Sequence, residues 1–179
     1  MSLTLATLIP ALVLAVLGAL LLVSNSMIVA MLKAFPRSKT AAGLLFGAGA
    51  LWFLYNVWHL SEADFGEYRK GLFIGFAAVA TLAFYYVPDF LAVRGASILM
   101  LLIATPLLDA GFLVYHPAQI CLYKIAVLLG VGLAIYLGSV PYRLRDFFQW
   151  LFATTRRPRA LGGFLLGYGL VLTVVAFTY

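Results

Sequence analysis

Six apolar segments, separated by short connections that carry most of the charge, limit what this chain can fold into. They cover about residues 3–32, 41–60, 71–87, 95–115, 120–140 and 160–179. A helix that crosses a bilayer needs about 20 consecutive, mainly apolar residues, and each segment comes close to that length or exceeds it. The sequence therefore predicts an all-α fold, a polytopic membrane helix bundle with six transmembrane helices.

The length and composition leave little room for anything else. The chain has 179 residues, of which 65% are hydrophobic and 10% are charged. Six spans with short connections use nearly all of it, so residues 1–179 are expected to form a single transmembrane domain. The net charge of +6 does not indicate nucleic-acid binding, because the basic residues flank apolar segments, where they set membrane orientation.

The basic residues are distributed unequally between alternate connections. By the positive-inside rule, the side with more Lys and Arg is cytoplasmic. Both termini are then exofacial, and we expect a multi-pass protein of a bacterial inner membrane. The nine residues on the cytoplasmic side are Lys33, Arg37, Lys39, Arg94, Arg143, Arg145, Arg156, Arg157 and Arg159, and the three on the other side are Arg69, Lys70 and Lys124.

The connection between the fifth and sixth segments, residues 142–157, has apolar residues at helical spacing on one face and Arg143, Asp146 and Gln149 on the other. This pattern predicts a short helix that lies flat on the cytoplasmic surface. It could contact anionic lipid, dock a partner, or only close the distance between two spans. The candidate lipid or partner surface consists of Arg143, Arg145, Phe147, Phe148, Trp150 and Leu151.

Small residues recur every fourth position in several segments, a spacing that lets membrane helices approach closely. We interpret these stripes as helix-packing seams. Six helices could use them all internally, but a bundle of this size must also expose some faces to lipid or to another protein. The stripes are Ala11, Ala15 and Ala19; Gly43 and Gly47; Gly71 and Gly75; Gly130, Ala134 and Gly138; and Gly163 and Gly167.

Two charged residues lie inside predicted spans. Asp109 and Lys124 flank Pro117 by eight and seven residues, so a tight antiparallel hairpin would bring them to similar depth. They could form an ion pair that locks two spans, or a site for protons or a solute. His116 shares a helical face with Asp109, and two residues of the second span complete this candidate polar site: Asn56 and His59.

No sequence motif assigns a catalytic residue or a metal site. His59 and His116 could in principle ligate haem, but both lie at the margins of their segments, where an interfacial histidine is ordinary, so no cofactor is implied.

Three functions remain open. The first is a non-catalytic integral subunit or assembly partner of a larger membrane complex, in contact with lipids and with other subunits or copies of itself. The second is a small channel or transporter with an exofacial polar site around Asp109 and Lys124. The third is a membrane redox or haem-binding protein, and whether the chain is an enzyme stays uncertain.

Overall fold

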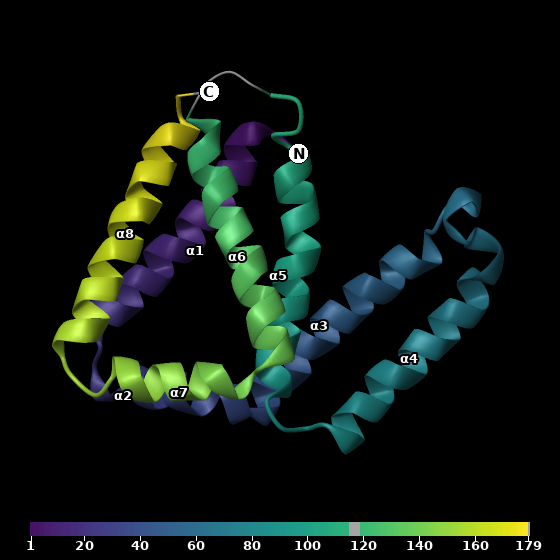
Figure 1. Ribbon diagram of the computed structural model, residues 1–179, viewed down its shortest axis with the longest axis horizontal. Helices are drawn as coiled ribbons and strands as arrows, with labels where there is room; N and C mark the ends of the chain where they lie inside the picture. Colours follow the sequence, from purple (N-terminus) through teal and green to yellow (C-terminus); the bar gives the residue numbers. More distant parts are fainter. Residues whose placement is uncertain (115–118, 179) are drawn as a thin grey trace. The chain divides into compact units, whose positions relative to one another are not determined.

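The computed structural model describes residues 1–114 and 119–178, and this part of the chain is helical with no strand (Figure 1). Within these described ranges, eight α-helices are connected by short turns and three 3-10 helices, which cover Phe35–Arg37, Glu62–Asp64 and Gly66–Tyr68. The α-helices are α1 (Leu3–Val23), α2 (Ser26–Ala34), α3 (Lys39–Trp58), α4 (Arg69–Tyr86), α5 (Leu91–Asp109), α6 (Ile120–Ser139), α7 (Tyr142–Leu151) and α8 (Arg156–Ala176).

Among the described residues, five helices are long and apolar enough to cross a membrane, namely α1, α3, α5, α6 and α8. The chain therefore has the composition of a helical membrane protein. The helix α4 coincides with the predicted third span but is less apolar, because Arg69 and Lys70 begin it and Tyr85 and Tyr86 end it. The sixth span stays a prediction.

The first predicted span, 3–32, is not one helix. Ser24 adopts a left-handed conformation with φ of 37°, and its amide donates to the Leu20 carbonyl, which ends α1. The Asn25 Oδ1 atom then accepts a hydrogen bond of 2.8 Å from the Ile28 amide, which begins α2. The polar residues inside this apolar run thus cap two helices, since short polar side chains satisfy backbone groups at helix ends.

The fourth and sixth predicted spans have different ends in the structure. The helix α5 ends at Asp109 rather than at residue 115, and the turn after it brings Gly111 against Tyr123 so closely that a Cβ would overlap the tyrosine hydroxyl. Leu113, in the same turn, has a positive φ of 58°. The helix α8 begins at Arg156, four residues before the predicted start of the last span, so three arginines lie in its first turn.

The chain divides into two compact units. Unit 1 contains residues 1–33, 103–133 and 145–179, and unit 2 contains residues 34–102 and 134–144. Each unit is built around one antiparallel pair of long helices, α1 with α8 in unit 1 and α3 with α4 in unit 2.

In unit 1, α1 and α8 approach at glycines. A Cβ added at Gly18 would lie 2.5 Å from the backbone nitrogen of Leu166, and one at Gly169 would lie 2.8 Å from the carbonyl oxygen of Ala11. Gly162 faces Gly18 in the same way, at 2.8 Å from its carbonyl oxygen. These positions need glycine because the opposing backbone occupies the space of a side chain.

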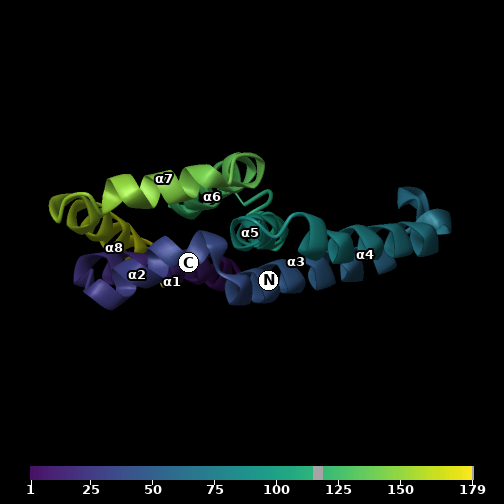
Figure 2. The ribbon, with the colours of Figure 1, turned by 90° about the horizontal axis from the view of Figure 1, so that it is seen from below.

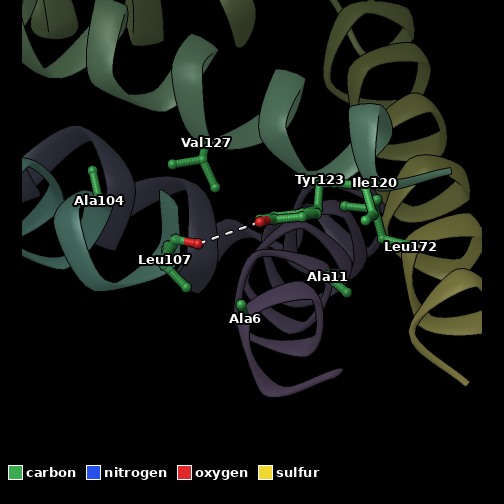
Figure 3. Packing of buried hydrophobic residues seen from close by; sticks show 8 residues of the cluster. All are labelled: Ala6, Ala11, Ala104, Leu107, Ile120, Tyr123, Val127 and Leu172. Carbon is green, nitrogen blue, oxygen red and sulfur yellow. Dashed lines mark hydrogen bonds between the residues drawn. The ribbon is translucent and has the colours of Figure 1, made fainter. Parts of the chain in front are cut away.

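The core of unit 1 forms where the ends of α5 and α6 pack on α1 and α8 (Figure 3). Tyr123 of α6 is fully buried there, and its hydroxyl donates a long hydrogen bond of 3.5 Å to the carbonyl of Leu107, in the last turn of α5. Tyr168 of α8 donates a bond of 2.8 Å to the Leu122 carbonyl of α6. The two phenols thus connect three helices through backbone carbonyls.

In unit 2, α3 and α4 lie side by side along their length (Figure 2). Three edge-to-face ring pairs hold them together, with centroid separations of 5.0 to 5.4 Å. The pairs follow the antiparallel register and are Phe46 with Phe84, Phe53 with Phe76, and Trp58 with Phe73. Such a geometry suits aromatic rings because the positive edge of one meets the negative face of the other.

The beginning of α5 completes the core of unit 2. A Cβ added at Gly95 would lie 2.6 Å from the Cα of Phe46, so this glycine permits α5 to cross α3 closely. Gly49 packs against the side chain of Ile98 in the same crossing. Leu91 and Ala92 are buried beside these contacts.

The predicted seams divide into used and open ones. Ala11 and Ala15 pack against Gly169, and a Cβ added at Gly138 would lie 3.5 Å from the Cβ of Ser97. The other three stripes are not packed, since a Cβ added to any of their glycines meets no atom of the described chain within 4 Å. These open positions are Gly43, Gly47, Gly71, Gly75, Gly163 and Gly167.

Candidate functional site

The predicted pair of Asp109 and Lys124, both in unit 1, is not joined by an ion pair in the structure. Asp109 is exposed at the last position of α5. The side chain of Lys124 instead lies over the turn after α5, where its Cε would be 2.9 Å from a Cβ at Gly111. The neighbouring Tyr123 packs on the same turn more closely than Lys124 does. The end of α5 and the start of α6 are therefore held together by ring and backbone contacts.

The other described members of the candidate polar site lie in the second unit. Asn56 and His59 belong to unit 2, at the end of α3, and both are exposed. The Nδ1 atom of His59 donates a hydrogen bond of 2.8 Å to the Tyr55 carbonyl, and the two rings lie 4.2 Å apart. This histidine therefore terminates its own helix. His116 lies outside the described residues.

The connection predicted to form a short amphipathic helix is helical, as α7. Leu151 is buried and Phe148 is half-buried, whereas Phe147 and Trp150 are 40% and 55% exposed. The two exposed rings are stacked, with centroids 6.1 Å apart. The sequence pattern predicted one surface for all these residues, but the helix divides them into a packed face and an exposed aromatic face.

Cations lie against the aromatic rings at this end of unit 1. The guanidinium of Arg157 is 4.5 Å from the centre of the Trp150 ring and donates a hydrogen bond of 2.8 Å to the carbonyl of the same residue. The amine of Lys33, at the end of α2, lies 5.9 Å from the ring of Phe152. Arg145 forms an ion pair of 2.8 Å with Asp146. Arg157 is the last residue of the connection 142–157 and was not among the residues predicted for this surface.

Unit 2 has a groove beside its aromatic contacts. The groove has a volume of about 440 Å³ and runs between α3 and α4. Most of its lining is apolar and much of it is small, and it includes one of the open glycines, Gly47. The lining residues are Gly47, Ala50, Leu51, Leu54, Ala77, Ala80, Thr81, Phe84 and Tyr85.

In the part of the chain that the structure describes, no three His, Cys, Asp or Glu side chains gather in a way that could hold a metal ion. The features that remain as candidates are the open helix faces of unit 2 and the basic, aromatic end of unit 1. Comparison with known proteins adds no relative, since no protein-family model, curated protein or solved structure matches this chain.

Proposed function

We propose that the chain is a non-catalytic integral subunit of a larger membrane protein complex, formed with other chains or with further copies of itself. The observation that supports this proposal best is the open face of the α3 and α4 pair. Four glycines on these two helices have no packing atom near them, although glycine in a helix interior costs about 1 kcal/mol relative to alanine.

A partner helix would pack closely at these glycines. In lipid the hydrophobic effect does little to join helices, so association depends on close backbone approach at small residues. The groove of about 440 Å³ between α3 and α4 offers such an approach, with Gly47 and Ala50 on one side and Ala77 and Ala80 on the other. A helix of a neighbouring subunit seated there would bury Gly47, which the chain itself leaves open.

The native mass of the particle tests the proposal. We expect the protein, purified in mild detergent from its own membrane, to migrate with partners or copies at a mass well above 19.5 kDa. Gly47→Leu should reduce the assembled fraction about tenfold or more, because the side chain fills the groove. Gly132→Leu is the matched control, since that glycine is equally open but belongs to none of the stripes. A monodisperse chain of 19.5 kDa that retains its cellular function would refute the proposal.

The proposed topology has six spans, with α4 as the third, α7 on the cytoplasmic surface and both termini exofacial, in a bacterial inner membrane. The distribution of basic residues supports it. In a Cys121→Ser background, Lys39→Cys should resist a membrane-impermeant thiol reagent in intact cells, and Glu67→Cys should react. The opposite labelling would invert the orientation, and equal labelling of both would remove α3, which lies between the two positions, as a span.

A further inference from the structure

The end of unit 1 formed by α7 and the start of α8 carries positive charge with little to balance it. Arg156, Arg157 and Arg159 lie in the first turn of α8, which contains no acidic residue. From residue 110 to the end of the chain, Asp146 is the only acidic residue, and it is already paired with Arg145. Positive side chains at a helix N-terminus are also repelled by the helix dipole, so this turn favours an external anion.

The structure places one of these cations, Arg157, against the exposed aromatic face of α7. Arg157 connects the two helices, through its hydrogen bond to the Trp150 carbonyl and its contact with the indole ring. Arg156 and Arg159, on either side of it, are exposed. The guanidinium of Arg157 therefore lies beside the stacked rings of Phe147 and Trp150, and two further exposed arginines share its turn of α8.

This combination matches the chemistry of a bilayer surface. Tryptophan and phenylalanine rings enter the region between headgroups and acyl chains, whereas arginine remains at the level of the phosphates. We propose that the surface formed by Phe147, Trp150, Arg156, Arg157 and Arg159 binds the headgroups of anionic phospholipids. The inference is independent of the subunit proposal, because it involves no residue of the groove in unit 2.

The start of α4 offers a comparison within the chain. It also begins with two exposed cations, Arg69 and Lys70, but these follow three acidic residues in the preceding 3-10 helices, Glu62, Asp64 and Glu67. The carboxylates offset the cations there, so the same type of helix end should show no preference for an anionic lipid. This makes Arg69→Gln/Lys70→Gln a matched control for Arg156→Gln/Arg159→Gln.

The experiment measures which lipid lies next to Trp150. Trp52→Phe and Trp58→Phe leave Trp150 as the only tryptophan, and the full chain is placed in phosphatidylcholine nanodiscs that contain brominated phosphatidylglycerol or brominated phosphatidylcholine. Bromine quenches indole fluorescence on contact. We expect phosphatidylglycerol to quench more strongly at equal mole fraction, and salt to weaken this preference.

Three double variants test whether the arginines of α8 cause this preference. Arg156→Gln/Arg159→Gln should reduce the preference for phosphatidylglycerol by about 25-fold, since each cation near an anionic surface contributes about fivefold. Arg156→Lys/Arg159→Lys should retain most of it, and Arg69→Gln/Lys70→Gln should change it less than twofold.

The proposal would be overturned if the two lipids quenched equally in the protein that keeps all its arginines. It would also be overturned if both double glutamine variants lost the preference for phosphatidylglycerol to the same extent. Loss of the preference on adding inorganic phosphate at constant ionic strength would overturn it as well, and would assign the site to a soluble anion.

Discussion

The two long helix pairs of this chain pack by opposite means. In unit 1, α1 and α8 meet at glycines whose missing side chains let the backbones touch. In unit 2, α3 and α4 meet through three pairs of aromatic rings, while their glycines Gly43, Gly47, Gly71 and Gly75 face open space. Glycine thus brings the backbones of α1 and α8 into contact, whereas between α3 and α4 it lines an open groove.

The effect of a small residue in a membrane helix depends on what lies opposite it. A glycine contributes to packing only where an opposing backbone comes close enough to exploit it, because the gain is van der Waals contact that decreases steeply with distance. In unit 1 the pair is complete by itself. In unit 2 the rings act as spacers, and the surface beside them is left for lipid or for another helix.

The largest expected effect comes from filling the seam of unit 1. Gly169→Leu should destabilise the protein by about 3 kcal/mol, because even its Cβ would lie 2.8 Å from backbone atoms of Ala11 and Ala15. Gly167→Leu, on the same helix, should change the stability by no more than about 0.5 kcal/mol, since that position is open. Unfolding in detergent micelles, followed by circular dichroism, gives both values. Equal losses would show that α1 and α8 do not meet closely at Gly169.

A smaller effect is expected from the ring pairs of unit 2. In a double-mutant cycle with Phe53→Ala and Phe76→Ala, the coupling energy should be about 1 kcal/mol, as for other edge-to-face pairs. The cycle removes the common loss of buried area and isolates the contact between the two rings. Phe65, which belongs to the same unit and is exposed before α4, gives a control partner for Phe53, and its coupling should be near zero.

The pattern of the sequence predicted helices well but predicted contacts poorly. Apolar runs and their flanking charges were enough to predict the five long apolar helices and α7, because helix formation follows from local composition. The four-residue stripes were less informative. On α8 the seam contains Gly162 and Gly169, seven residues apart, while the stripe of Gly163 and Gly167 is open. Spacing alone cannot show which face of a helix its neighbour will occupy.

Two helix boundaries that the apolar pattern did not predict have different physical causes. The break after Val23 depends on the left-handed conformation of Ser24 and on a side-chain cap from Asn25. Serine and asparagine also occur within continuous membrane helices, so their presence in the sequence does not predict a break. The early end of α5 depends on Tyr123, which is distant in sequence and packs on Gly111. A tertiary contact of this kind leaves no signal in the apolar pattern of either helix.

The smallest expected effect concerns Asp109 and Lys124, which the sequence predicts at similar depth in neighbouring spans. Since Asp109 and Lys124 form no ion pair in the structure, Asp109→Asn and Lys124→Gln should be additive, with a coupling energy below about 0.5 kcal/mol. A buried pair that locked the hairpin would behave differently. Each single change would then cost about 3 kcal/mol or more, and the double change would recover much of the loss.

The same cycle therefore tests whether unit 1 depends on charge or on close packing. Additive, small effects at Asp109 and Lys124, next to a large effect at Gly169, would assign the stability of this unit to its glycine seam and to the rings of Tyr123 and Tyr168. Strong coupling would mean that the two side chains meet in the membrane. In that case Asp109→Asn, with the fold retained, becomes the variant in which to look for lost proton or cation transport.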